Sequence, residues 1–165
     1  MLFYDTPLET KIDLLNSITA EQASEISTLS HQLGYKTSAD ETLSRVRKII
    51  AKDDECIFIG VQGETIVGWI HAFFTVRVET EPFVEIAGLV VHEAYRKKQI
   101  GRNLIDAVCI WAQPHHCSQI RVRCNEIRSE THRFYRNLGF TLEKKQLIFA
   151  LDSSRHAPKL HLSNI

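Results

Sequence analysis

The chain has 165 residues, of which 44% are hydrophobic and 24% are charged, with 20 basic and 20 acidic side chains. This length accommodates one domain with an apolar core, and this balance excludes disordered and fibrous classes of protein. The longest clean apolar run, Ile86–Val91, is far shorter than the roughly 20 residues that cross a bilayer. The first residues lack the basic region and apolar stretch of a secretion signal, so we expect a cytoplasmic protein that does not bind membranes.

Charge is distributed unevenly along the chain although its sum is zero. Residues 1–85 carry 14 acidic and 7 basic side chains, whereas residues 86–165 carry 6 acidic and 13 basic ones. Unless the two halves intermix on folding, this favours an anionic ligand in the second half. Aromatic residues are not interleaved with Arg121, Arg123 and Arg128 as a nucleic-acid stacking platform requires, so we expect no nucleic-acid partner.

The four cysteines are Cys56, Cys109, Cys117 and Cys124. They form no CxxC pair and lie in apolar or strand-like stretches, which predicts buried free thiols. His115 and His116 precede Cys117, but consecutive residues rarely converge on one ion and no second ligand pair lies at zinc spacing. We therefore expect no metal site.

Two capping boxes organise the first half of the chain. Thr19 with Gln22, and Ser38 with Glu41, each precede apolar residues at helical spacing. Gly34 is the expected stop of the first helix. In order, we expect a strand at 12–15, helices at 19–34 and 38–50, hairpin strands at 56–61 and 65–76, a loop at 79–82 and a strand at 83–91.

The second half alternates helices and strands. A helix after the 96–102 turn carries Leu104, Val108 and Trp111 on one face and ends at Pro114. A strand at 120–124, a helix stopped by Gly139 and a closing strand at 140–151 follow. A hairpin-rich first half joined to a βαβ second half predicts an α+β fold with a mixed sheet and helices on both faces. We expect one domain over 1–151 and a loosely ordered tail over 152–165.

The stretch from Leu89 to Arg102 runs from an apolar strand through a basic turn into a helix. Unpaired N–H groups and the helix dipole make such a helix start an anion site of the kind that binds phosphates. Gly101 lets a phosphate approach the backbone closely. The alternative is a solvated basic turn. Four cations raise the local potential: Arg96, Lys97, Lys98 and Arg102.

This turn resembles motif A of the GNAT superfamily of N-acetyltransferases, Arg/Gln-x-x-Gly-x-Gly/Ala after a strand with a Leu-x-Val pattern. Leu89 and Val91 match the strand, and Arg96 and Gly101 match the turn. Ile100 matches the variable position between the two glycine positions of the motif. A departure from the motif is Gln99, which stands where the family usually has its first glycine.

A second segment, Thr131–Phe140, resembles the later family helix that ends in Phe-Tyr-x-x-x-Gly-Phe. The two matches occur in the family's order, and the expected elements agree over about residues 10–151. The resemblance implies a GNAT-like fold with a mostly antiparallel sheet and splayed parallel central strands. It also implies an enzyme that transfers the acetyl group of acetyl-CoA to a primary amine by direct attack.

The resemblance places the pantetheine arm of acetyl-CoA along Leu89, Val90 and Val91, with the Val91 N–H as oxyanion donor. The pyrophosphate then rests on Arg96, Lys97, Lys98, Gln99, Ile100, Gly101 and Arg102. Asn125 follows a strand where family members often have an asparagine that touches the pantetheine. The commonest spacing puts that asparagine at Arg128 instead, so Asn125 is either a cofactor contact or a helix cap.

Two residues are candidates for the chemistry. Tyr135 matches the tyrosine that donates a proton to the departing thiolate, a task that suits a neutral phenol. Phe134 and Leu138 are i, i+4 partners and are expected on the core face, which turns Tyr135 elsewhere, although simple packing is the alternative. Glu85 occupies the place of the general base in the histone-acetylating branch, where an apolar strand would raise its pKa.

Other groups compete with Glu85 for the role of base. Glu85 is alternatively a structural carboxylate at a sheet edge or opposite an arginine, and the base is then a histidine or ordered water. The histidines that compete by their intrinsic chemistry are His71, His92 and His132.

The acceptor is expected to be a small cationic amine. The resemblance assigns the acceptor side to segments that contain acidic residues, which attract cations unless they are merely solvated. Alternatives are a non-catalytic CoA-binding module of the same fold and a protein N-terminal or lysine acetyltransferase. We expect a small-molecule amine as partner and a monomer or homodimer. The acidic residues are Glu25, Asp40, Glu41, Glu79 and Glu81.

Overall fold

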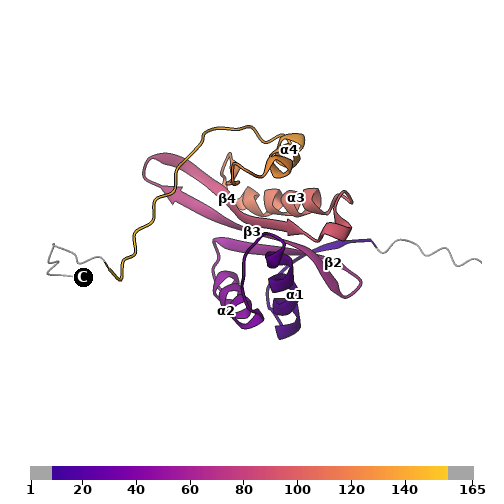
Figure 1. Ribbon diagram of the computed structural model, residues 1–165. Coiled ribbons are helices and arrows are strands. Elements are labelled where there is room, and N and C mark those ends of the chain that lie inside the picture. Colours follow the sequence, from indigo (N-terminus) through magenta and orange to yellow (C-terminus); the bar gives the residue numbers. More distant parts are fainter. Residues whose placement is uncertain (1–8, 156–165) are drawn as a thin grey trace, which may run out of the picture. The chain divides into compact units, whose positions relative to one another are not determined.

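The computed structural model describes residues 9–155 and divides the chain into two compact units, residues 1–128 and 129–165. The first unit contains the sheet and three α-helices, and the second contains α4 (Figure 1). The elements are β1 (Lys11–Leu14), α1 (Ala20–His31), α2 (Ala39–Ile50), β2 (Glu55–Gln62), β3 (Thr65–Arg77), β4 (Thr80–Val91), η1 (Glu93–Tyr95), α3 (Ile100–Ala112), η2 (Gln113–His115), β5 (Ile120–Val122) and α4 (Ser129–Asn137).

The sheet has the strand order β1-β2-β3-β4-β5, which is the order of the chain. Neighbours from β1 to β4 are antiparallel, and β5 is parallel to β4. The α3 connection between β4 and β5 is a crossover, as a parallel pair requires. The predicted mixed, mostly antiparallel sheet is confirmed.

Helices cover both faces of this sheet, with α1 and α2 on one face and α3 on the other (Figure 1). Both predicted capping boxes form, at Thr19 with Gln22 and at Ser38 with Glu41. The apolar stripe of α3 includes the predicted Leu104 and Val108, which are buried. The core on the α1 and α2 face consists of Leu15, Ile18, Ala23, Ile26, Leu29, Val46, Ile57, Ile59, Ile66 and Val90.

Two predicted elements are wrong. The loop expected at 79–82 is a tight turn at 78–79, because β4 begins at Thr80, which pairs with Arg77 across the hairpin. The closing strand expected at 140–151 does not form in the described part of that segment. Its apolar side chains, such as Leu147 and Phe149, are exposed, and a strand without a partner ladder is not stable.

The cysteines are free thiols, as expected, but only Cys56 is buried. Burial raises the pKa of the Cys56 thiol to about 12, so it stays protonated and inert. The prediction of burial is wrong for Cys109 and Cys124, which are exposed. Cys109 lies on the outer side of α3, which apolar periodicity alone did not separate from the core side.

Among residues 9–155 there is no cluster of three or more histidine, cysteine or acidic side chains that could hold a metal ion. Within the same range, none of the helices combines the length and apolar character needed to cross a bilayer.

Candidate active site

The parallel strands β4 and β5 separate after a short region of pairing. Their register joins only Val84–Ile86 of β4 to residues 120–122 of β5. Beyond it, residues 88–91 of β4 pair with β3 on one side, and residues 87–91 have no strand on the other side within the described chain. This confirms the splayed strands, and it leaves a stretch of β4 edge without a strand partner among the described residues.

A β-bulge at Ala87 sets the direction of the N–H groups on this edge. His71 pairs with Gly88 and Ala72 with Ile86, so Ala87 is an extra residue in β4. Before the bulge, the Val84 N–H donates to Gln119 O toward β5 at 3.1 Å. After it, the His92 N–H donates to Val67 O on the β3 side at 2.8 Å.

Strand alternation then gives the direction of the neighbouring groups. Since N–H groups alternate along a strand, those of Leu89 and Val91 point to the open edge. The carbonyl of Val91 points the same way, because Arg96 Nε donates to it at 3.3 Å. Two N–H groups are therefore available to a chain lying beside β4, at two of the positions that the family resemblance implied.

The open edge leads into the basic turn. Arg96, Lys97, Lys98 and Gln99 are all exposed, and the first turn of α3 follows at Ile100. Gln99 is the N-cap of α3, but its side chain makes no capping hydrogen bond. The first N–H groups of α3 are therefore not occupied by a capping side chain and can bind a ligand. The turn therefore combines unpaired N–H groups, positive charge and exposure, which fits a pyrophosphate.

The backbone at Gln99 is left-handed, with φ of 63°, although the side chain is not glycine. This explains the glycine usual at this position in the family, because only glycine adopts a left-handed conformation without steric cost. The loop keeps the conformation despite the departure from the motif. Lys97 is left-handed as well, with φ of 62°.

We expect Gln99→Gly to raise the free energy of unfolding by about 0.5–1 kcal/mol, because relief of left-handed strain exceeds the added entropy of the unfolded chain. The matched control is Lys98→Gly, at a neighbouring exposed residue whose φ is not positive. That control should lose stability. Urea denaturation measures both, and equal losses in the two variants would contradict the strained turn.

Glu85 is buried on β4 and is held by two arginines. Arg123 Nε lies 3.0 Å from Glu85 Oε1, and Arg77 Nη2 lies 3.5 Å from Glu85 Oε2. The carboxylate thus makes the structural pairing that the sequence left open as an alternative to its role as base. The role of Glu85 as base is a prediction that this geometry does not favour. Protonation would remove the negative charge that the two guanidinium groups stabilise.

A second polar pair lies on the same face of the sheet, closer to the bulge. His71 pairs with Gly88 in the register, and its Nε2 lies 2.9 Å from Glu55 Oε2. Burial acts to raise the pKa of the Glu55 carboxyl, but hydrogen bonds from Lys52 and His71 bring that pKa below its ordinary value. An ionised Glu55 accepts the Nε2 proton of His71, which leaves Nδ1 as the basic nitrogen.

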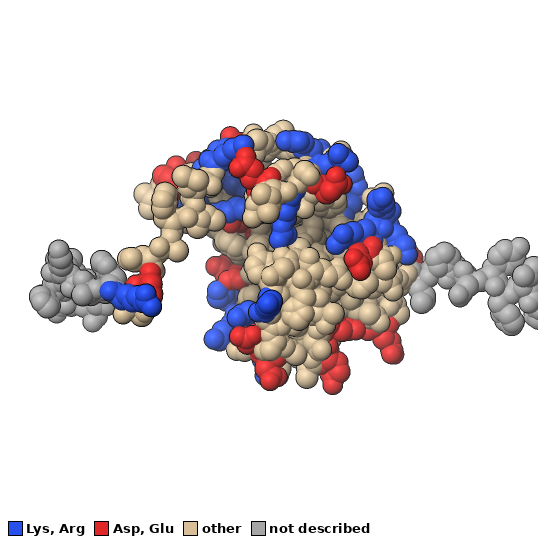
Figure 2. Space-filling view, viewed as in Figure 1, with Lys and Arg blue, Asp and Glu red and all other residues tan. Residues whose placement is uncertain are grey.

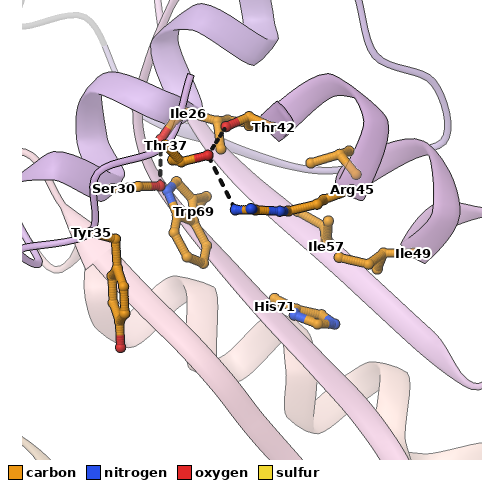
Figure 3. Close-up of a pocket in the computed structure, with 11 residues that line it drawn as sticks. Ile26, Ser30, Tyr35, Thr37, Thr42, Arg45, Ile49, Ile57, Trp69 and His71 are labelled. Carbon is orange, nitrogen blue, oxygen red and sulfur yellow. Dashed lines mark hydrogen bonds between the residues drawn. The ribbon is translucent and has the colours of Figure 1, made fainter. Parts of the chain in front are cut away.

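A pocket of about 240 Å³ opens beside His71, between α1 and α2 and strands β2 and β3 (Figure 3). Trp69 and His71 line it from β3, Ile57 from β2 and Arg45 from α2. The indole N–H of Trp69 is buried and has no hydrogen-bond partner among the described residues. The Trp69 ring also touches the bulge, because a Cβ added at Gly88 would meet it at 3.0 Å.

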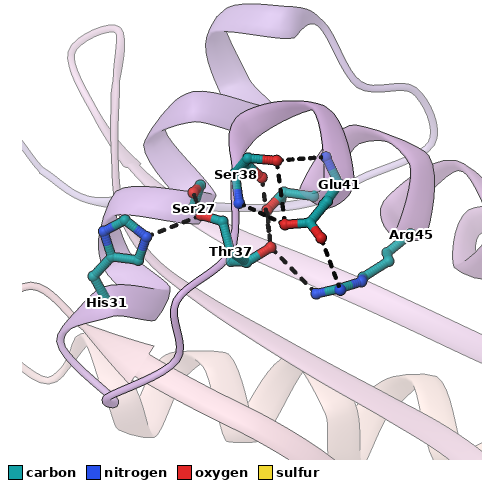
Figure 4. A network of polar contacts seen from close by, with 7 residues as sticks. Ser27, His31, Thr37, Ser38, Glu41 and Arg45 are labelled. Atoms are coloured by element: carbon teal, nitrogen blue, oxygen red, sulfur yellow. Dashed lines mark hydrogen bonds and ion pairs between the residues drawn. The ribbon is translucent and has the colours of Figure 1, made fainter.

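A polar network holds Arg45 at this pocket (Figure 4). Arg45 Nη1 donates to Thr37 Oγ1 at 3.2 Å, and Nη2 lies 3.7 Å from Glu41 Oε1. Glu41 is itself fixed, since its Oε2 accepts from the Ser38 N–H in the capping box. The network therefore orients a guanidinium group whose side chain is 65% exposed.

In the second unit, the Phe-Tyr-x-x-x-Gly-Phe motif forms the end of α4. The N–H of Phe140 donates to Tyr135 O at 3.1 Å, that of Gly139 donates to Arg136 O at 3.0 Å, and Gly139 has φ of 93°. These bonds form a Schellman motif, and the Tyr135 and Phe140 rings, 5.3 Å apart, make its apolar contact.

The structure reverses the expected faces of this helix. Tyr135 is the buried residue of α4, whereas Phe134 and Leu138 are only half-buried. Tyr135 thus has a structural role at the helix end, and its role as proton donor is a prediction.

Asn125 forms a turn rather than a helix cap. Its Oδ1 accepts from the Ile127 N–H at 3.1 Å, and α4 begins only at Ser129. Arg128, at the commonest position of the family's asparagine, donates to Leu33 O at 2.7 Å and so joins this turn to the end of α1. A contact of Asn125 with pantetheine is a prediction.

A model of the acetyltransferase (GNAT) family matches residues 20–140, and the chain belongs to this family. None of the curated proteins matches the sequence. Solved structures share the fold at low identity.

One solved structure is AAC(6')-Iy in complex with the bisubstrate analog CoA-S-monomethyl-acetylneamine: 21% identity, TM-score 0.73, covering 87% of this chain and 98% of that one. Another is the aminoglycoside 6'-N-acetyltransferase AAC(6')-Ih from Acinetobacter baumannii, with 19% identity, TM-score 0.75 and coverage of 87% and 99%. A transcriptional regulator from Bacillus halodurans C-125 has 19% identity, TM-score 0.74 and coverage of 87% and 100%.

Local sequence patterns predicted a site at the edge and the turn, and they did not predict the pocket. Trp69, Arg45 and Glu55 were not candidates, and His71 was only an alternative base. These residues come from three separate elements and carry no local motif. The one signal available was a pair of polar residues at a hairpin: Glu55 directly precedes the strand expected at 56–61, and His71 lies in the strand expected at 65–76.

Proposed function

We propose that this protein transfers the acetyl group of acetyl-CoA to a primary amine at the bulge of β4. The observation that carries the proposal is the open edge at residues 87–91, which leads directly into the exposed basic turn at the start of α3. The solved neighbours support this cosubstrate, since one of them is AAC(6')-Iy in complex with CoA.

In the proposed reaction the pantetheine arm lies along β4 and the pyrophosphate on the 96–102 turn. The amine must be neutral to attack the thioester carbon, and a nearby base takes its proton. The Val91 N–H donates to the oxyanion that forms as the carbon becomes tetrahedral. The C–S bond then breaks, and the CoA thiolate takes up a proton, for which we propose Tyr135 as the donor on the basis of the family motif.

His71 is better placed than Glu85 to be the base. It lies opposite Gly88 at the bulge and also lines the pocket, whereas Glu85 is bound by Arg77 and Arg123. Glu55 holds one ring nitrogen of His71 and stabilises the imidazolium that proton uptake produces. We therefore propose His71 as the base, with Glu55 as its positioning residue.

The structure gives the predicted cationic acceptor less support than it gives the proposed cosubstrate site. In Figure 2, acidic side chains gather along the lower edge of the view, where Figure 1 places α1 and α2. Glu41 is used in the capping box, and the carboxylate of Glu25 accepts from the Ile66 N–H at 3.4 Å. The aminoglycoside neighbours favour a cationic acceptor, but their identity of about 20% supports the fold alone.

The test of the proposed function is turnover. Purified protein is mixed with acetyl-CoA and a panel of amines, and the release of free CoA is followed with a thiol-reactive dye. Amine-dependent release, with the acetylated product found by mass spectrometry, supports the proposal. Tight CoA binding without release for any amine, including protein N-termini and lysine peptides, would instead support the non-catalytic module.

Tyr135→Phe separates a catalytic role from a structural one, because it removes the hydroxyl and keeps the ring contact with Phe140. If Tyr135 protonates the thiolate, the variant should lose about 10²-fold in kcat with little change in CoA affinity. Steady-state kinetics and calorimetry measure the two quantities. An unchanged kcat, when chemistry limits the rate, leaves Tyr135 only its place at the helix end.

A further inference from the structure

The pocket beside the bulge has the size of a single ring. An apolar cavity of roughly 150 Å³ holds benzene, so the 240 Å³ here accommodates a six-membered ring with a short chain. The apolar part of the lining is Ile26, Tyr35, Val46, Ile49, Ile57 and Trp69.

The pocket reaches the reaction centre through two neighbouring residues of β3. Trp69 lines it and packs against Gly88, and His71 lines it and lies opposite Gly88 in the register. A group held in the pocket therefore has one end next to the bulge, where the proposed transfer takes place. This places the pocket on the path of the acceptor.

The charges around the pocket favour an anionic group on the acceptor. Of the described residues that line it, Arg45 and His71 are the ionisable ones of basic type, and none is acidic. Glu55, which faces His71 from β2, is already bound by Lys52 and His71. Glu41, the carboxylate next to Arg45, is engaged by Arg45 and by the Ser38 N–H. Among the described residues around the pocket, an acceptor with several positive charges would therefore meet cations and carboxylates that are already paired.

The same charge pattern continues along this face of the sheet. Glu85 is surrounded by Arg77 and Arg123, and the guanidinium of Arg121 lies 4.0 Å from the centre of the Phe83 ring. Around Glu85, guanidinium groups therefore outnumber the single carboxylate. A carboxylate on the acceptor is attracted to these guanidinium groups, and a polyamine is repelled.

Arg45 is the residue best placed to bind that carboxylate. Figure 3 shows it reaching from α2 toward Thr37 at the side of the pocket. A guanidinium has five N–H donors, more than the contacts with Thr37 and Glu41 use. Its planar shape suits a carboxylate with two oxygen atoms.

We propose that the acceptor is a primary amine that carries both an aromatic ring and a carboxylate, as an aromatic amino acid does. Its ring lies in the pocket against Trp69, its carboxylate pairs with Arg45, and its amine faces His71 at the bulge. This rests on the proposed acetyl transfer, and it names the acceptor class of that site.

Binding is measured separately from turnover with Trp69 as the reporter. The chain has two tryptophans, so Trp111→Phe leaves Trp69 as the single source of indole fluorescence. In this variant, with and without CoA, we expect a saturable change on titration with phenylalanine. Phenylethylamine, which lacks the carboxylate, should bind about five-fold more weakly, which is the upper end of what an exposed ion pair contributes. Alanine and spermidine should bind more weakly still.

A pair of arginine variants tests the role of Arg45. Arg45→Gln should bring the affinities for phenylalanine and phenylethylamine to the same value. The control is Arg47→Gln, on the same helix but outside the pocket, which should keep the five-fold difference. A merely structural Arg45 would weaken both ligands equally and leave their ratio unchanged.

The outcomes separate this inference from the proposed function. The inference is overturned by equal affinity for phenylalanine and phenylethylamine, by preference for spermidine, or by no response to aromatic ligands. In each of these cases, acetyl transfer to another amine leaves the proposed function intact. Saturable binding of phenylalanine with the expected ratio, but without any release of CoA, supports the pocket and counts against the enzyme.

Discussion

Gly101→Glu is expected to weaken CoA binding by roughly 100-fold or more, the largest single effect on the cofactor. Gly101 is the second residue of α3, where N–H groups without intrahelical partners face outward. A glutamate there puts bulk and negative charge where the pyrophosphate is proposed to rest. Repulsion between like charges at such a contact costs several kcal/mol, and each 1.4 kcal/mol is a factor of ten. Titration calorimetry with CoA gives the affinity directly.

Gly101→Ala is the matched control. It adds one methyl group without charge, keeps the N–H, and replaces glycine by a better helix former. We expect it to keep most of the CoA affinity and to unfold at a slightly higher denaturant concentration. Unchanged CoA affinity in a folded Gly101→Glu variant would move the phosphate away from this turn and remove the main support for the proposed function.

The parts of the structure that the sequence predicted depend on neighbours in the chain. Ser38 and Glu41 are three residues apart, and the contacts of their capping box lie within one turn of helix. The same holds for the end of α4, where Gly139 and Phe140 close a Schellman motif on Tyr135 and Arg136. A residue type at a fixed offset is sufficient to predict such features.

The bulge shows what local patterns do not contain. Residues 86–91 form a continuous apolar run, so no alternation of polar and apolar side chains reveals the extra residue at Ala87. Yet this residue decides that Leu89 and Val91, rather than Gly88 and Val90, present N–H groups at the open edge. Only the register between strands makes the shift visible.

The partners in the candidate site are set by tertiary structure. Arg123 reaches Glu85 across 38 positions of the chain, and His71 reaches Glu55 across 16. Glu85 lies on a strand that is apolar in sequence, and this predicted a desolvated base. The arginines that pair with Glu85 come from β3 and from the end of β5, and no local sequence pattern shows that their side chains reach this carboxylate.

The second large effect is expected for His71→Gln. Loss of a general base lowers the rate by about 10²- to 10⁴-fold, and we expect at least the lower value in kcat with acetyl-CoA affinity unchanged. A general base must be unprotonated before it can take up the proton of the amine. The wild-type kcat/KM should therefore rise with pH, and the variant should lose that part of the rise. Added imidazole should restore part of the rate.

The decisive comparison is with Glu85→Gln, because the sequence predicted that residue as the base. Glutamine removes the charge that Arg77 and Arg123 share but keeps the shape of the side chain. Both arginines are partly exposed, so we expect a loss of about 1 kcal/mol or less in stability. The pH dependence of kcat/KM should be retained. If Glu85→Gln abolishes the pH dependence and His71→Gln keeps it, the base is Glu85, and the His71–Glu55 pair only orders the wall of the pocket.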